Sequence, residues 1–396
     1  PGTGKTTTIN LMIRCFEMEK MDIVLAAPTG RAAKRMTEAT GYEAKTIHRL
    51  LEVSGGIEDG DSSHFEKNED NPIEADAVIL DEMSMVDIHL MYSLLKAIVP
   101  GTRLILVGDS NQLPSVGPGN VLKDIIDSKA FSVIRLSKIY RQAESSHIVL
   151  NAHKINAGEL ITLDNKNKDF FFFEKKDVRS VMGALVYLVK TRLPEYIGAS
   201  PFEIQVLTPM RKGELGVEHL NEVLQYYLNP ASESKKEKEG RTGVFREGDK
   251  VMQVKNNYKL EWKITNAKGF SIEEGLGVFN GDMGIIKQIN TYSERITVVF
   301  DENREAEYPF SSLDELELAY AITIHKSQGS EYPAVVLPLL SGPPILCNRN
   351  LLYTAITRAQ KCVAIAGRQS MVEQMIHNET EQKRYSGLND CLKEGL

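Results

Sequence analysis

The first eight residues constrain the fold of this chain more than any other feature. They read Pro-Gly-Thr-Gly-Lys-Thr-Thr-Thr, which is the pattern G-x-x-x-x-G-K-[ST] without its leading glycine. Glycines let successive backbone N–H groups point at the phosphates of a nucleotide, and the helix that follows adds its positive end. We expect Lys5 to reach the β- and γ-phosphates and Thr6 to hold Mg²⁺. The truncated pattern predicts a nucleotide-binding α/β domain in a piece of a longer protein.

A plain glycine-rich turn before a helix is the alternative interpretation of this start. It is disfavoured by two carboxylates that follow an apolar strand further along the chain. Residues 77–80 read Ala-Val-Ile-Leu and are followed by Asp81 and Glu82. Asp81 is placed to hold Mg²⁺ through water, and Glu82 to polarise an attacking water. An acidic strand cap is the simpler reading of this pair, and the phosphate loop before it argues against that reading.

The bulk composition is that of a multidomain protein with real apolar cores. A length of 396 residues predicts two to four domains, and a hydrophobic fraction of 42% is ordinary. The net charge of −7 argues against a generally basic protein but allows a local basic groove. The four cysteines lie far apart, which favours neither a disulfide framework nor a zinc site. No apolar run is long enough to span a membrane, so we expect a soluble, cytoplasmic protein without membrane contact.

Short apolar runs place parallel strands in the first third of the chain. Residues 23–27, 77–80 and 104–107 are apolar and bounded by polar or turn residues, as in buried strands of a βαβ sheet. The turn-rich stretch 54–63 interrupts this unit. We interpret it as part of a projecting hairpin over about 51–75, with a disordered loop as the alternative.

The remainder of the chain predicts a second α/β unit with an insertion. The charged stretch 231–240 reads as a solvated linker. Short strands separated by glycine turns over about 242–312 predict a small β-barrel. The barrel strands are expected at 249–254, 284–289 and 295–300, and the α/β strands at 170–173, 204–207, 335–337 and 362–366, with helices at 178–189 and 351–358.

Three further polar residues are candidates for chemistry on a nucleotide phosphate. Gln112 follows the strand at 104–107, so its amide can sense a γ-phosphate or orient water at the carboxyl edge of the sheet. A simple turn is its alternative. Arg141 and Arg358 are lone arginines near apolar stretches, and each is either a surface ion pair or an arginine finger that neutralises transition-state charge.

Taken in order, these segments resemble the superfamily-one helicases, and most closely the RecD-like 5′-to-3′ DNA helicases. The resemblance covers nearly the whole chain. It rests on residues 1–6 (Walker A), 27–36 (motif Ia), 46–51, 81–84 (motif II), 108–114 (motif III), 140–142 (motif IV), 321–331 (motif V) and 352–359 (motif VI).

The resemblance implies an α/β fold with two RecA-like P-loop NTPase motor domains that bind ATP and Mg²⁺ between them. The first would span 1–137 with a pin hairpin at about 51–75. The second would comprise 138–230 and 316–396, with an SH3-like β-barrel inserted at 242–315. We expect a monomer that couples ATP hydrolysis to movement on single-stranded DNA and unwinds duplex at single-strand/double-strand junctions, in recombination or repair. Its polarity rests on the resemblance alone.

The resemblance also assigns roles to individual residues. Arg141 and Arg358 would act on the γ-phosphate. His48 is either a packed histidine at a helix start or a DNA contact, with the packed role favoured. Nucleotide contacts are implied for Gly2, Thr3, Gly4, Lys5, Thr6, Thr7 and Glu331, with Mg²⁺ held by Thr6 and Asp81, and DNA contacts for Thr29, Lys34, His325, Ser327 and Gln328.

Other functions fit the sequence less well. A relaxase-helicase or an RNA-directed motor would share the motor motifs, but the segment 46–51 leans toward the RecD-like group. A subunit of an exonuclease V-type complex is the main alternative, with recombination or repair nuclease subunits as partners. A nuclease of its own would need a further carboxylate cluster on a metal, and we find none beyond Asp81 and Glu82. Two departures stand out: the adenine-holding segment before residue 1 is absent, so this fragment is expected to bind nucleotide poorly, and the hairpin is acidic.

Overall fold

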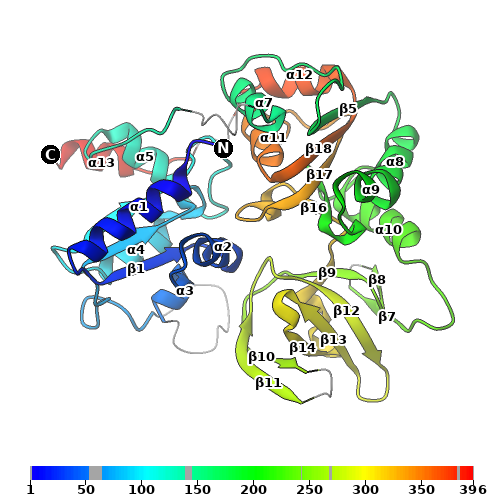
Figure 1. The fold of residues 1–396 in the computed structure, drawn as a ribbon, viewed down its shortest axis with the longest axis horizontal. Coiled ribbons are helices and arrows are strands. Elements are labelled where there is room, and N and C mark those ends of the chain that lie inside the picture. Colours follow the sequence, from blue (N-terminus) through cyan, green and yellow to red (C-terminus); the bar gives the residue numbers. More distant parts are fainter. Residues whose placement is uncertain are drawn as a thin grey trace. The chain divides into compact units, whose positions relative to one another are not determined.

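The computed structural model describes residues 2–52, 65–138, 145–241, 243–266, 270–380 and 384–395 (Figure 1). It divides into two compact units. Unit 1 comprises Pro1–Asn156, Gln328–Ser330 and Thr380–Leu396, and unit 2 comprises Ala157–Ser327 and Glu331–Glu379. Each unit is described by itself.

Unit 1 is built on a four-stranded parallel sheet with the strand order β2-β1-β3-β4. The three apolar runs predicted as parallel strands form β1, β3 and β4, and the prediction is confirmed to within one residue at each end. The strands are β1 Ile23–Ala27, β2 Ala44–Thr46, β3 Ala77–Leu80 and β4 Arg103–Leu106.

Helices cover both faces of this sheet because side chains alternate along its strands. Val78 and Leu80 of β3 join one apolar cluster with Leu94 of α4, whereas Ile79 joins another with Ile9 and Ile13 of α1. The helices of unit 1 are α1 Lys5–Met18, α2 Gly30–Thr40, α3 Ile47–Leu50, α4 Ile88–Lys96, α5 Val121–Ser128, α7 His147–Asn156 and α13 Leu388–Glu394, with a 3-10 turn η1 at Met83–Met85.

Within the predicted hairpin at about 51–75, the segments that flank residues 53–64 lie together. The N–H of Glu66 donates to the carbonyl of Glu52 at 2.8 Å, and that of Lys67 to the carbonyl of Leu51 at 3.1 Å. Residues 53–64 lie outside the described part of the chain, so the pin itself stays a prediction.

The C-terminal segment belongs to unit 1, whereas the sequence assigned 316–396 to the second motor domain. Helix α13 packs against α5, and Leu388 lies against the apolar cluster that contains Leu122. Asp124 of α5 accepts hydrogen bonds from Ser386 and Asn389. These partners lie on unit 1, which explains the difference from the expected boundary.

Unit 2 contains a five-stranded parallel sheet with the order β16-β6-β17-β18-β5, as expected for a second α/β domain. Its strands are β5 Phe170–Glu174, β6 Ile204–Thr208, β16 Ala321–Thr323, β17 Tyr332–Leu339 and β18 Ala359–Gly367. Its helices are α8 Val178–Tyr187, the π-helical turn η2 Leu188–Arg192, α9 Leu193–Ile197, α10 Val217–Leu228, α11 Arg349–Ile356 and α12 Gln369–His377, with a 3-10 turn η3 at Pro201–Glu203.

Unit 2 also contains an antiparallel sheet of seven strands, with the order β11-β10-β14-β13-β12-β9-β15. The three predicted barrel strands correspond to β9, β12 and β13. The strands are β9 Lys250–Gln253, β10 Asn257–Thr265, β11 Ser271–Val278, β12 Met283–Asn290, β13 Arg295–Phe300, β14 Glu305–Pro309 and β15 Leu316–Leu318, with 3-10 turns at η4 Asp301–Asn303, η5 Phe310–Glu315 and η6 His325–Ser327.

The interpretation of 231–240 as a solvated linker was wrong for its second half. Residues Glu237–Gly240 form β7, which pairs antiparallel with β8, Gly243–Arg246. Contacts of charged side chains, and not the burial of apolar residues, hold β7 in place. The Nε of Arg246 lies 2.6 Å from Glu237, and the Lys238 ammonium lies 4.5 Å from the centre of the Phe310 ring.

One apolar cluster runs through both large sheets of unit 2. It includes Val206 and Val336 of the parallel sheet together with Val251 and Val298 of the antiparallel sheet. Because the two sheets share a core, they are expected to unfold together.

A buried carboxylate joins the two sheets of unit 2 as well. Asp249 is fully buried and accepts hydrogen bonds from Tyr320 at 2.9 Å, Asn229 at 2.7 Å and Gln225 at 2.6 Å, and from the backbone N–H of Arg246 at 2.7 Å. Burial raises the pKa of Asp249, and the side-chain donors oppose that effect.

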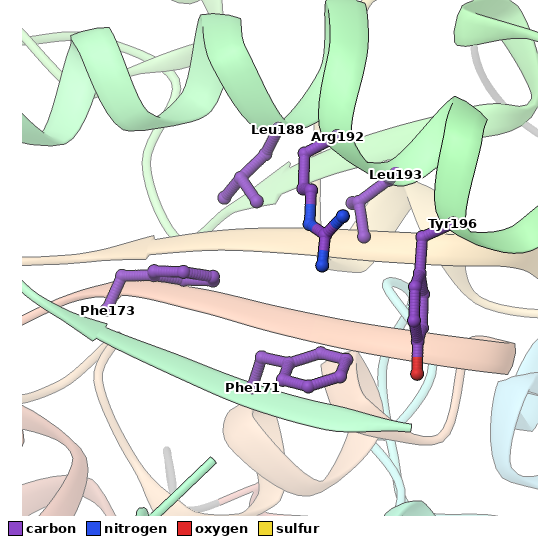
Figure 2. Close-up of a pocket in the computed structure, with 6 residues that line it drawn as sticks. All are labelled: Phe171, Phe173, Leu188, Arg192, Leu193 and Tyr196. Atoms are coloured by element: carbon purple, nitrogen blue, oxygen red, sulfur yellow. The ribbon is translucent and has the colours of Figure 1, made fainter. Parts of the chain in front are cut away.

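A small pocket lies between β5 and the turn formed by η2 and α9, and its volume is about 70 Å³. Figure 2 shows the Arg192 side chain pointing into it, near the rings of Phe171 and Tyr196. Drug-sized and cofactor ligands occupy pockets of roughly 300–1,000 Å³. The pocket is too small for a nucleotide, and no predicted site residue lines it.

Candidate nucleotide site

The phosphate loop adopts a conformation that its glycines permit. Gly2 and Gly4 have positive φ values of 72° and 82°, which side chains with a Cβ rarely adopt. Gly4 caps α1, and its carbonyl accepts both the N–H and the hydroxyl of Thr8. The first helical turn therefore begins at Lys5, which leaves its early N–H groups free of helical partners. Such a turn can bind an anion.

The two carboxylates follow β3 at the carboxyl edge of the sheet, as predicted. The N–H of Asp81 donates to the Ala26 carbonyl of β1 at 3.0 Å, and the N–H of Met83 donates to the carbonyl of Val107, which follows β4, at 3.0 Å. These bonds hold the turn in line with both neighbouring strands. Glu82 has a positive φ of 54° and is 3% exposed, and its N–H donates to Asp81 Oδ1 at 2.8 Å.

The acid pair lies within the field of two cations. Burial and the neighbouring Glu82 raise the pKa of Asp81, while the charges of Lys5 and Arg35 lower it. The structure thus brings Lys5 and Asp81 into one electrostatic environment. Nη1 of Arg35, on α2, lies 4.0 Å from Glu82 Oε1. The sequence interpretation did not single out Arg35, although it lies within the segment matched to motif Ia.

Gln112 follows β4 and is 6% exposed. Its N–H donates to the Asp109 carbonyl at 3.2 Å, and its Nε2 lies 3.4 Å from Asp109 Oδ2. Its Oε1 is buried and makes no hydrogen bond within the described part of the chain. This oxygen is an acceptor directed away from bulk solvent.

Three residues of the segment matched to motif V belong to unit 1. Gln328 Nε2 donates to the Leu113 carbonyl at 2.7 Å. At Gly329, with a φ of 72°, a Cβ would lie 2.7 Å from Thr29 Oγ1, so the chain requires glycine there. Thr29 caps α2 by accepting the N–H of Ala32. Gln328, which was predicted to contact DNA, is 5% exposed, and its side-chain amide is already hydrogen-bonded to the Leu113 carbonyl.

The other residues expected to contact DNA occupy varied positions. Ser327 is fully buried and donates to the Ile324 carbonyl at 2.7 Å. Lys34 is partly exposed and lies 3.9 Å from Glu38 on α2, and His325 is half-buried in η6. Lys34 and His325 are therefore more accessible than Ser327 to a DNA strand that approaches from solvent.

His48 is half-buried, with its ring centre 6.0 Å from that of Phe65. Burial lowers the pKa of His48, and the charge of Asp87 opposes this effect. This environment fits the packed histidine favoured by the sequence.

The remaining candidates lie in unit 2 or outside the described residues. Arg358 is 2% exposed, its Nε donates to the Thr354 carbonyl, and its Nη2 donates to Thr357. This burial does not fit a surface ion pair. Gln360 donates to Glu331 at 3.3 Å. Arg141 lies outside the described part of the chain, so its role stays a prediction.

Three family profiles match successive parts of the chain. Residues 1–118 match an AAA domain, 220–300 an ATP-dependent RecD-like DNA helicase SH3 domain, and 318–366 a UvrD-like helicase C-terminal domain. The RecBCD enzyme subunit RecD of Mycobacterium tuberculosis is 32% identical, with 95% of this chain and 67% of that protein covered. The corresponding subunit of Mycolicibacterium smegmatis is 30% identical over 99% and 71%. The chain belongs to the RecD-like helicase family.

Another RecD-like relative is the ATP-dependent RecD2 DNA helicase of Deinococcus radiodurans, which is 36% identical over 93% of this chain and 46% of that protein. The chain thus spans about half the length of this relative. Among solved structures, a Pif1 helicase from Bacteroides in complex with ADP-AlF3 and single-stranded DNA has a TM-score of 0.53 at 19% identity, covering 94% of this chain and 88% of that one.

At this identity, the likeness to Pif1 concerns the fold. The predicted fold class, two RecA-like units with an SH3-like insertion, is confirmed. Within the described ranges, no helix has both the length and the apolar character of a membrane span.

Proposed function

We propose that the full-length protein is an ATP-dependent DNA helicase that moves 5′-to-3′ on single-stranded DNA and unwinds duplex at junctions during recombination or repair. The observation that carries this proposal is the arrangement in unit 1. The helix start at Lys5, the acid pair after β3 and Gln112 after β4 are all held by one parallel sheet, at the edge where such sheets bind ligands.

Each of these groups has a distinct part in hydrolysis. The N–H groups of the first turn and the Lys5 ammonium bind the β- and γ-phosphates, together with Gly2, Thr3, Gly4, Thr6 and Thr7. Glu82 accepts a proton from the attacking water and orients it. The Gln112 amide senses the γ-phosphate. Arg358 and Arg141 neutralise charge in the transition state, and Glu331 contributes to nucleotide binding.

The residues present fit Mg²⁺. Thr6 offers a hydroxyl and Asp81 a carboxylate, which are the hard oxygen ligands that Mg²⁺ prefers. Burial and the neighbouring Glu82 raise the pKa of Asp81, which supports the proposal because a cation would offset this buried negative charge. No cluster of three or more acidic, His or Cys ligands occurs in the described ranges. When bound, the ion neutralises charge on the β- and γ-oxygens.

For the DNA strand, we propose contacts from Thr29, Lys34 and His325. The same proposal for Ser327 and Gln328 requires them to leave their present hydrogen bonds. The domain division proposed from the sequence, 1–137, 138–230 with 316–396, and 242–315, is retained, except that the packing of the chain supports assigning 145–156, 328–330 and 384–395 to the first motor domain.

A second candidate function is that of a subunit in a helicase–nuclease complex. It is favoured by the relatives named RecBCD enzyme subunit RecD, which match at 30–32% identity. In this case the protein would associate with nuclease subunits instead of acting as a monomer. Size-exclusion chromatography of the native protein from its own cells distinguishes the two.

The direct experiment measures ATP hydrolysis by the full-length protein with and without single-stranded DNA. We expect hydrolysis only with DNA, and expect Lys5→Ala to abolish it. Lys45→Ala, an exposed lysine in β2, is the matched control and should behave as wild type. Strand displacement on 5′- and 3′-tailed duplexes then measures polarity. Equal hydrolysis with and without DNA would count against a DNA-driven motor.

A further inference from the structure

The backbone that follows Gln112 is held on two sides. Residues 115–119, which we term the 115–119 loop, connect Gln112-Leu113-Pro114 to α5. On one side the loop lies against the start of α4, where the N–H of Ile88 donates to the Pro118 carbonyl at 3.0 Å. A Cβ at Gly117 would lie 1.9 Å from the Asp87 carboxylate, which caps α4. The loop therefore has no room to move toward α4.

On the other side the loop is held by a single arginine from the C-terminal segment. Arg384 Nη2 donates to the Ser115 carbonyl at 2.5 Å, and Nη1 donates to the carbonyls of Gly117 and Gly119 at 2.5 and 2.9 Å. Nη1 also lies 3.3 Å from Ser115 Oγ. One planar cation thus binds three successive alternate carbonyls, a geometry that the guanidinium fork allows and an ammonium does not.

The segment that carries Arg384 is anchored independently of the loop. Ser386 Oγ donates to Asp124 Oδ2 at 2.6 Å, Asn389 Nδ2 donates to the Asp124 carbonyl at 3.2 Å, and Leu388 packs on the apolar cluster of unit 1. Since the anchor lies on α5, the position of Arg384 is set by the body of unit 1 and not by the loop that it binds.

We infer that Arg384 is a positioning residue for ATP hydrolysis: it fixes the 115–119 loop so that Gln112 stays aimed at the nucleotide. This inference rests on the proposed function. Gln112 lies three residues before Ser115, and its buried Oε1 has no hydrogen bond within the described residues. An unbonded amide oxygen keeps its direction only where the adjoining backbone is fixed, and misplacement by about 1 Å can reduce a rate about 100-fold.

The test compares Arg384→Ala, Arg384→Lys and Ser386→Ala in the full-length protein. Ser386→Ala is the matched control, because it removes one of the three anchoring contacts of the segment and leaves those of Asn389 and Leu388, and all contacts of Arg384 with the loop, in place. With saturating single-stranded DNA, we expect Arg384→Ala to lower kcat about tenfold or more with KM for ATP changed less than about twofold. Arg384→Lys should recover only part of the loss, and Ser386→Ala should stay within about twofold of wild type.

A second readout does not depend on hydrolysis. Hydrogen–deuterium exchange of peptides over 108–122 should be about tenfold faster in Arg384→Ala than in wild type or Ser386→Ala. The reason is that the loss of the charge-assisted hydrogen bonds leaves the loop free to open. If the wild type hydrolyses no ATP but exchange rises as expected, the proposed function fails and the positioning of the loop stands.

Two results would overturn the inference. One is an Arg384→Ala protein with unchanged exchange over 108–122. The other is a Ser386→Ala protein that loses as much kcat as Arg384→Ala, because the segment would then stabilise unit 1 generally without positioning Gln112.

Discussion

Replacing Asp249 by alanine is expected to destabilise unit 2 more than any other single change in its polar network. The substitution removes the acceptor of four hydrogen bonds and leaves the donors of Gln225, Asn229, Tyr320 and the Arg246 backbone buried without it. Breaking a buried charged network from one side costs about 3–5 kcal/mol. Tyr320→Phe removes one of the four donors and should cost about 1.5 kcal/mol.

The single tryptophan of the chain provides the assay. Trp262 lies on β10, with the Arg304 guanidinium 5.5 Å from its ring centre, and its surroundings are lost when the antiparallel sheet unfolds. For a unit of this size, 1 kcal/mol shifts Tm by about 2–4 °C. Thermal unfolding followed by Trp262 fluorescence should therefore show a Tm lower by about 6–20 °C for Asp249→Ala and about 3–6 °C for Tyr320→Phe.

Asp301→Ala is the control, because this aspartate is exposed in η4, the turn between β13 and β14, and its loss should change stability by no more than about 0.5 kcal/mol. The reasoning is refuted if Asp249→Ala lowers Tm by no more than Tyr320→Phe does. That result would mean that the four donors find other partners or water once the carboxylate is gone.

Four further outcomes are expected. Glu82→Gln should bind ATP normally but stop turnover, because the carboxylate acts on water and not on the ground state; equilibrium binding and single-turnover hydrolysis check this, and lost affinity with normal turnover would show that its role is misassigned. Arg358→Ala should keep DNA binding and lose about 10³-fold in turnover at saturating DNA and ATP, whereas a loss below about threefold would exclude an arginine finger. Deleting 54–70 should preserve DNA-stimulated ATPase and reduce strand displacement in a forked-duplex assay; unchanged displacement removes the pin from the mechanism. Glu317→Gln should lower the free energy of unfolding at neutral pH by about 1–3 kcal/mol, measured by urea denaturation. Although burial opposes it, Arg211 lowers the pKa of Glu317, so this stabilisation is present above the ordinary value of 4.5 and the difference from wild type should fade as the pH falls through the lowered pKa; a difference that persists in acid would contradict the assignment.

Much of the fold was predictable because apolar runs and glycines act locally. The run 77–80 is fully buried on both faces, so its composition alone indicated a parallel strand. Glu237–Gly240 was missed because its strand is stabilised by contacts to Arg246 and Phe310, which no local pattern reveals. Two longer strands were not singled out either: β11 is exposed over its first half, and β10 was missed although its polar and apolar residues alternate as in a half-buried strand.

In the candidate site too, the residues that have a local sequence signal were predictable and the one that has none was not. Lys5, Asp81, Glu82 and Gln112 each follow a local signal, a glycine loop or a strand end. Arg384 carries no such signal, because its partners lie about 265–269 residues away in the sequence. Only the folded chain shows that an arginine near the end of the sequence and a loop near its beginning meet.

The return of residues 384–395 to unit 1 has a consequence for synthesis on the ribosome. Asp124 and Ser386 are 262 residues apart. At roughly 5–20 residues per second, the anchor of the C-terminal segment is made roughly 13–50 s after α5. Throughout that interval, the apolar surface around Leu122 lacks its contact with Leu388, so unit 1 is completed only after the residues of unit 2 have been synthesised. On nascent chains the patch that Leu388 covers is therefore exposed for tens of seconds, and transiently exposed apolar surface of this kind favours aggregation during synthesis.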